Sequence, residues 1–193
     1  QSTGEGGPFA SKPVPENLNW DAWLGQAPLV DYCPERCHFS FRWWYEYSGG
    51  ILTDWGAHHI DICQWALGQE KSGPLTVDGS KTKLPMIENG YNTPKHPSLF
   101  LTYPKDIEVE ITTGNEGLLF EGTEGRMFVN RGRITGKPIE DQDKDQGLKD
   151  KTMALVQEIY GKDRKPVSHM ADFFRAVDDR KAPISDAESQ HRT

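Results

Sequence analysis

Three acid and base side chains recur at helical spacing in the second quarter of the chain: Asp54, His58 and Asp61. They fall within about 60° of one another on a helical wheel. An apolar stripe lies beside them and consists of Ile51, Trp55, His59, Ile62 and Ala66. Carboxylates next to a buried face are costly unless they are used or paired, and they favour the protonated form of a neighbouring imidazole. The spacing therefore predicts general acid/base chemistry centred on His58.

The same spacing has simpler interpretations. An Asp and a His four residues apart on a helix are also typical of an ordinary local ion pair, worth a few tenths of a kcal/mol. His59 lies inside the apolar stripe and is expected to be a hydrogen-bonded core histidine. A metal site built from Asp54, His58 and Asp61 would need a fourth ligand that the sequence does not identify, so we expect no metal.

A helix must hold these side chains, and the pattern predicts one from Ile51 to Leu67. Gly49 and Gly50 break the preceding segment, and Gly68 is a typical helix stop. Before the two glycines, aromatic residues at every second position from Cys37 to Tyr47 predict a strand. The candidate chemistry is therefore expected where a strand turns into a helix.

Short apolar runs separated by glycine turns fill residues 75–134 and predict successive strands. Tight connections of this kind favour an antiparallel sheet in meander order. We expect an α+β fold with a large open, mostly antiparallel sheet and helices on one face. Residues 1–19 are rich in Gly, Pro and Ser and are expected to form a linker, with the domain itself in residues 20–193.

Helices are expected again near the end of the chain. Apolar residues three and four apart predict helices over residues 151–160 and 169–179. Ser168 is placed to cap the second of these helices. Ser185 with Glu188 three residues later forms a capping-box pattern for a last helix.

Composition excludes several classes of protein. The 193 residues carry a net charge of −7, which argues against a nucleic-acid partner. No apolar run approaches the roughly eighteen residues of a membrane span, so no membrane partner is expected. Three cysteines do not make a disulfide scaffold, and with no second Cys or His pair they do not make a zinc site either. We expect a cytoplasmic location, and both ends of the chain look cut from a longer protein.

The stretch GGILTDWGAHHID, residues 49–61, resembles the GG-x(3)-D-x-G-x-H-x-x-D signature of the Gfo/Idh/MocA family, named after glucose–fructose oxidoreductase and inositol dehydrogenase. The GTEG of residues 122–125 is similar to the G-T-x-G turn of that family. HMADFF at residues 169–174, followed by Pro183-Ile184 and Asp186-Ala187-Glu188, is similar to its closing helices. The resemblance extends from about Pro15 to Arg192.

This resemblance implies an NAD(P)-dependent oxidoreductase that acts on CH–OH groups of sugars, cyclitols or related polyols. Its members combine a Rossmann domain, which carries a Glu-Lys-Pro motif with a catalytic lysine, and an α+β domain that shapes the substrate pocket. The sequence matches only the second domain, because it contains neither a strand followed by G-x-G-x-x-G nor a Glu-Lys-Pro. We therefore expect NAD or NADP to be bound mainly by a domain outside this sequence, and the fragment alone to be inactive. The resemblance also implies a homo-oligomer formed through the open sheet face.

Site residues follow from the resemblance one position at a time. His58 matches the acid/base histidine of the family, which exchanges a proton with the substrate hydroxyl. Asp54 matches its acidic partner, which orients the substrate or the imidazole. Asp61 matches a third polar position, for which a structural role is expected before a chemical one.

Four further residues are candidates for substrate binding. Arg42, Trp44 and Tyr45 lead into the two glycines, and such aromatic faces and guanidinium groups suit a sugar pocket. His38 is a weaker candidate on the same segment. The alternative for these residues is sheet core and sheet surface. Two other functions stay open: a sugar-binding or assembly module without catalysis, and a metal-dependent hydrolase or isomerase that uses the Asp and His residues.

Overall fold

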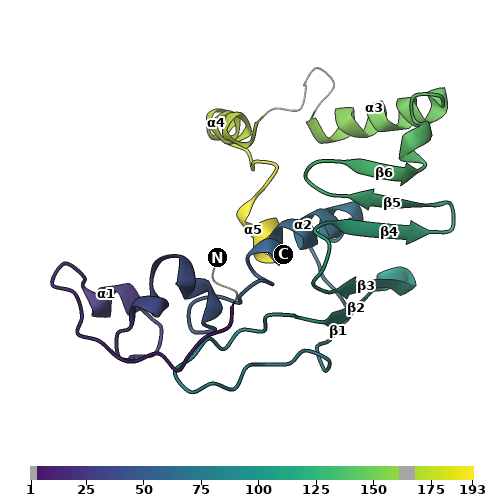
Figure 1. The fold of residues 1–193 in the computed structure, drawn as a ribbon. Coiled ribbons are helices and arrows are strands. Elements are labelled where there is room, and N and C mark those ends of the chain that lie inside the picture. Colours follow the sequence, from purple (N-terminus) through teal and green to yellow (C-terminus); the bar gives the residue numbers. More distant parts are fainter. Residues whose placement is uncertain (1–3, 161–167) are drawn as a thin grey trace. The chain divides into compact units, whose positions relative to one another are not determined.

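The computed structural model describes residues 4–160 and 168–193. The chain forms two compact units, one from Gln1–Ala66 with Ser72–Gly114 and the other from Leu67–Lys71 with Asn115–Thr193. Each unit contains helices and a three-stranded antiparallel sheet (Figure 1). The expected α+β class is therefore confirmed, and the strands divide between two sheets. No helix in the described ranges is long and apolar enough to cross a membrane.

The first unit begins with aromatic packing around a short helix, α1 (Trp20–Leu24). The Asn19 side chain accepts a hydrogen bond from the Ala22 N–H at the start of this helix, and Gly25 ends it with a positive φ of 55°. Trp20 is buried, and its indole N–H donates to the Val30 carbonyl at 2.8 Å. A buried cluster of Trp20, Leu24 and Cys37 forms one part of the core.

The segment expected to be a strand from Cys37 to Tyr47 is helical instead. It contains the 3₁₀ helix η2 (His38–Trp43), and another 3₁₀ helix, η1 (Pro34–Arg36), directly precedes it. Trp43 and Trp44 are both buried although they are neighbours, whereas strand neighbours point to opposite faces of a sheet. Backbone hydrogen bonds from Ser40 N to Cys37 O and from Trp44 N to Phe41 O close tight turns over this segment. The strand predicted from the alternation of aromatic residues is therefore wrong.

The sheet of the first unit joins β1 (Thr76–Asp78), β2 (Leu99–Tyr103) and β3 (Ile107–Ile111) in that order. The 3₁₀ turn η3 (Pro104–Asp106) links β2 to β3. The register of β2 with β3 places apolar residues opposite one another on one face of the sheet, namely Leu99 with Ile111, Leu101 with Val109 and Tyr103 with Ile107. The other face pairs Phe100 with Glu110 and Thr102 with Glu108. One face is thus apolar, and the other carries carboxylates.

The second unit contains the meander β4 (Leu118–Gly122), β5 (Gly125–Val129) and β6 (Ile134–Lys137), seen as three adjacent arrows in Figure 1. The short 3₁₀ helix η4 (Ile139–Asp141) follows β6. The helix α3 spans Gln146–Tyr160, so it begins five residues before the position expected from the sequence.

Two capped helices end the second unit. In α4 (His169–Asp179) the Ser168 hydroxyl accepts from the Ala171 N–H at 3.2 Å, which confirms the expected cap. The helix α5 (Ala187–His191) is capped by Asp186, which accepts from the backbone N–H groups of Glu188 and Ser189. The expected cap at Ser185 was therefore wrong by one residue. An aspartate carboxylate, which can accept several N–H groups at once, replaces the hydroxyl there.

Candidate active site

The turn before the candidate helix depends on Gly49 and Gly50. Gly50 has a φ of 66°, and a Cβ built on it would lie 2.5 Å from Thr93 Oγ1. The Gly50 N–H donates to the Arg42 carbonyl at 2.8 Å, and the Gly50 carbonyl accepts from the Asp54 N–H at 3.1 Å. The Thr53 hydroxyl accepts from the Gly49 N–H at 2.9 Å. These bonds fold the chain back on itself and bring Asp54 close to Arg42.

The helix α2 spans Trp55–Ala66, so Asp54 lies just before its first residue. Its most buried residues are Cys63 and Gln64, which are 8% and 2% exposed. Trp55 and Ala66 are exposed, so the apolar stripe expected from the helical wheel is not the buried face. The wheel included residues from 51 onward, but residues 51–54 form turns and therefore do not share the helical phase.

Two sequence candidates meet in an ion pair between Arg42 Nη1 and Asp54 Oδ2. The Arg42 side chain is 21% exposed and the Asp54 side chain 30% exposed. Arg42 Nε also donates to the Phe39 carbonyl at 3.0 Å, and the guanidinium carbon lies 3.7 Å from the centre of the Phe39 ring. Three contacts therefore fix the guanidinium: the Asp54 carboxylate, the Phe39 carbonyl and the Phe39 ring. Among the described residues, the ion-pair partner of Asp54 is Arg42 and not His58, the partner suggested by the spacing.

The two histidines of α2 have different environments. His58 is exposed, and its ring lies edge-on to that of Trp55 with the ring centres 6.1 Å apart. His59 is partly buried, and its Nδ1 donates to the Trp55 carbonyl at 3.2 Å, as a core histidine was expected to do. His59 Nε2 is buried without a partner among the described residues. Asp61 is partly buried on the same helix. His58 thus presents its imidazole to solvent.

The other candidates lie at different depths. Tyr45 is 51% exposed, and its backbone N–H donates to Asn92 Oδ1 at 2.7 Å. His38 is exposed at the start of η2, with a φ of 49°. Trp44 is only 1% exposed and lies in a core cluster with Cys33, Trp43 and Tyr91. The structure thus leaves Tyr45 and His38 accessible to a ligand, whereas Trp44 belongs to the core.

The sequence did not predict the buried polar network around Arg36, which contacts the segment that carries Trp44 and Tyr45. Arg36 is 4% exposed and contacts Glu46 Oε1 at 3.5 Å, the Tyr47 hydroxyl at 3.1 Å and Asn89 Oδ1 at 3.2 Å. Its guanidinium carbon lies 3.7 Å from the centre of the Trp44 ring. The network fixes the segment that carries the candidate residues.

Glu46 connects this network to Asn92, whose Nδ2 donates to Glu46 Oε2 at 3.0 Å. Burial works to raise the pKa of Glu46. The hydrogen bond from Asn92 and the positive charge of Arg36 outweigh it and hold the pKa below its ordinary value. Glu46 is therefore a charged anchor of the fold and not a proton donor.

Metal and cofactor binding each require a particular grouping of residues. Across residues 4–160 and 168–193, no three His, Cys, Asp or Glu side chains are grouped so that they could hold a metal ion, and this includes Asp54, His58 and Asp61. A dinucleotide site needs parallel strands joined through a glycine-rich turn and a helix. All strand pairs in the described part of the chain are antiparallel. The described strands therefore do not have the parallel arrangement of such a site.

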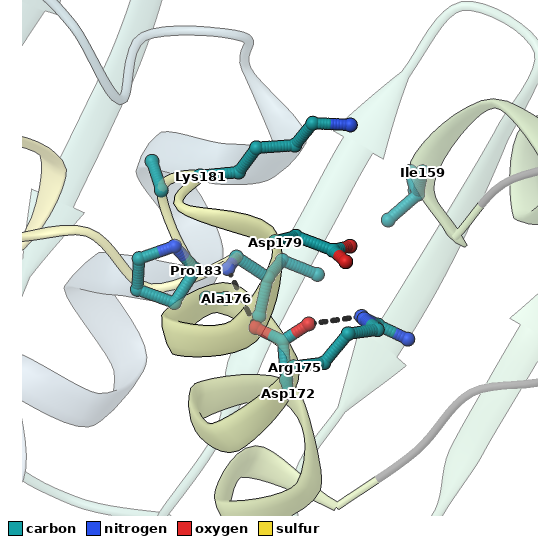
Figure 2. Close-up of a pocket in the computed structure, with 9 residues that line it drawn as sticks. Ile159, Asp172, Arg175, Ala176, Asp179, Lys181 and Pro183 are labelled. Atoms are coloured by element: carbon teal, nitrogen blue, oxygen red, sulfur yellow. Dashed lines mark hydrogen bonds and ion pairs between the residues drawn. The ribbon is translucent and has the colours of Figure 1, made fainter.

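The second unit contains a cavity of about 190 Å³, and the charged residues at its wall hold the fold together. Figure 2 shows Asp172 and Arg175 of α4 facing each other at its wall, where they form an ion pair. The second oxygen of Asp172 accepts from the Ile184 N–H at 2.8 Å. This bond, followed by the contact with Arg175, holds the pKa of the buried Asp172 below its ordinary value. The carboxylate therefore anchors the chain that follows α4.

Comparison with protein families gives one match for this chain. A family model described as the C-terminal alpha/beta domain of an oxidoreductase family, Gfo/Idh/MocA, matches residues 5–130. The matched range contains the whole candidate site and ends after β5. Comparison with curated proteins gives no match.

Proposed function

The chain belongs to the Gfo/Idh/MocA oxidoreductase family, and on that basis we propose that it is the substrate domain of an NAD(P)-dependent enzyme acting on the CH–OH group of a sugar, cyclitol or related polyol. The observation that carries this proposal is the exposed imidazole of His58 on the same short stretch of chain as the Arg42–Asp54 ion pair. A proton carrier close to hydrogen-bonding groups suits a reaction that interconverts an alcohol and a carbonyl group.

His58 is proposed to move the proton. An alcohol that loses a hydride must also lose its hydroxyl proton, and an imidazole can take up and release a proton near neutral pH. The ring is exposed, so a substrate oxygen can reach it, and the Trp55 ring lies edge-on beside it. In the direction of oxidation, the imidazole accepts the hydroxyl proton. In the direction of reduction, it returns that proton to the carbonyl oxygen.

Arg42 and Asp54 are proposed to orient the substrate. The described contacts of Arg42 use Nη1 and Nε, so N–H groups on Nη2 remain to donate to a sugar hydroxyl. The Asp54 carboxylate, already compensated by Arg42, can accept from a second hydroxyl. Tyr45 supplies an exposed aromatic face beside this segment. Together these groups would fix which carbon of the polyol faces the hydride acceptor.

The cofactor is proposed to be held mainly by a dinucleotide-binding domain outside this chain, because the family match is to a C-terminal domain and the described strands are antiparallel. NAD or NADP would supply the hydride chemistry, and this chain would supply the substrate pocket and the proton carrier. The fragment alone is therefore expected to be inactive.

A test of this function uses the intact protein and a panel of sugars, cyclitols and polyols. Formation of NADH or NADPH is followed by absorbance with each compound in turn. We expect turnover with at least one polyol and none with the isolated 193-residue chain. Saturable binding of a polyol without any reduction of either cofactor would instead support the sugar-binding module. Absence of both binding and turnover across the panel would contradict the proposed substrate class.

A further inference from the structure

A hollow of about 440 Å³ in the first unit is lined by three separate segments of chain. The first is Gly4 with Glu5, and the last is Lys95 with His96. The middle segment contributes Lys81, Lys83, Leu84 and Pro85. None of the candidate active-site residues lines this hollow. Its volume lies within the range of about 300–1,000 Å³ that is typical of small-molecule sites.

Hydrogen bonds hold the walls of the hollow in place. The Thr82 hydroxyl donates to the Ser98 carbonyl at 2.8 Å and accepts from the Ser98 N–H at 3.0 Å. This contact ties the segment that carries Lys81 and Lys83 to the segment that carries Lys95 and His96. His96 is itself oriented by a 2.9 Å hydrogen bond between its Nδ1 and Thr113 Oγ1.

The second of these segments is also anchored by burial. Thr93 is fully buried, and its hydroxyl donates to the Trp43 carbonyl at 3.3 Å. Pro94 and Pro97, on either side of Lys95 and His96, are buried as well. Proline fixes φ, so little backbone freedom remains between them. The two basic residues therefore project from a backbone that is already ordered.

The charge of the hollow is opposite to that of the chain. Its lining contains three lysines and one glutamate, in a chain with a net charge of −7. Glu5 Oε2 lies 3.0 Å from Lys95 Nζ and compensates that lysine. Lys81 is close enough to Asp78 to help lower the pKa of that carboxyl, after the hydrogen bonds from Ser80. Lys83 has no ion-pair partner among the described residues.

We propose that this hollow binds the phosphate group of a small phosphorylated molecule, of the size of a sugar phosphate. Lysines from two segments line the hollow, and their charge suits a phosphate dianion, which lysine binds as a point charge. Leu84 and Pro85 add an apolar wall for the carbon skeleton of the ligand. Glu5 competes with the ligand for Lys95, so binding displaces the glutamate. This inference does not rest on the proposed oxidoreductase function.

The test measures binding by the intact protein with isothermal titration calorimetry at low ionic strength. The probes are glucose 6-phosphate, inorganic phosphate and glucose. Lys83→Gln should weaken the binding of glucose 6-phosphate about three- to tenfold. Glu5→Gln should tighten it about two- to fivefold, because Lys95 is then released. Lys12→Gln and Glu16→Gln change charge equally on exposed residues outside the hollow and serve as controls.

Opposite effects of the two variants cannot come from misfolding, which weakens binding in both. Tighter binding of glucose 6-phosphate than of inorganic phosphate supports a sugar-phosphate ligand, and equal binding supports a site for phosphate alone. Glucose should not bind here. The proposal is overturned if neither phosphate compound binds saturably, or if the control variants change binding as much as Lys83→Gln and Glu5→Gln do.

Discussion

Replacing Gly50 by alanine tests whether the turn before α2 is fixed in the way described. Gly50 has a φ of 66°, and an alanine Cβ there would lie 2.5 Å from Thr93 Oγ1 and 2.7 Å from Thr93 Cβ. The left-handed backbone costs alanine about 1 kcal/mol. Forcing a methyl group against a fully buried side chain adds about 1–3 kcal/mol. We therefore expect Gly50→Ala to lower the free energy of unfolding by about 2–4 kcal/mol.

Gly68→Ala is the matched control. Gly68 has a similar φ of 64°, but a Cβ there would meet nothing within 4 Å, so only the backbone cost of about 1 kcal/mol applies. Both variants are unfolded in urea and followed by far-UV circular dichroism and tryptophan fluorescence. The difference between the two variants measures the contact with Thr93. Equal destabilisation of the two would refute the close approach of Gly50 to Thr93.

Two further predictions concern the charge network and the helix caps. Glu46 has a pKa below its ordinary value in the folded protein, so its contribution to stability is present above about pH 4.3 and is lost as the pH falls through the folded pKa. The free energy of unfolding of Glu46→Gln should therefore fall less than that of the parent protein between pH 6 and pH 3. Urea denaturation at each pH measures this, and an equal fall in the two proteins would contradict the prediction. Ser168→Ala should lower the free energy of unfolding by about 1 kcal/mol through loss of the α4 cap, whereas Ser185→Ala should leave it nearly unchanged. Thermal unfolding of both variants checks this, and a larger effect at Ser185 would count against the capping described.

Local chemistry made several elements predictable from the sequence. Ser168 acts within one turn of its own helix, and its residue type already favours that position. Short runs of apolar residues likewise predicted β2 to β5, because strand pairing in a meander involves neighbours in the chain.

Long-range contacts were not predictable in this way. The Arg36 network joins residues that are ten and 53 positions apart, and no spacing rule connects them. The burial of Trp43 and Trp44 side by side likewise depends on packing from several segments. An arginine between two cysteines in an aromatic-rich segment was the one local sign of this core.

The candidate site was predictable in part. The sequence placed Asp54 and His58 together on one short stretch, and the family match covers both. It paired Asp54 with His58, whereas the structure pairs it with Arg42 across the two-glycine turn. The partner was missed because the wheel extended the helix back to residue 51, and α2 begins at Trp55.

Association through a sheet face stays a prediction. Residues Glu108 and Glu110 share a face of the first sheet with Phe100, so that face is not uniformly apolar. Like charges on such a face disfavour close contact between two copies of it. Light scattering of the intact protein measures its oligomeric state directly.

His58 is proposed to carry the proton of the reaction. The most direct measurement compares kcat of the intact enzyme with that of His58→Gln, once a polyol substrate has been found. His191→Gln, which replaces an exposed histidine of α5, serves as the control. We expect kcat to fall by about 10²–10⁴-fold in His58→Gln and to stay unchanged in the control. A His58→Gln variant that turns over within about twofold of the parent enzyme would contradict the claim.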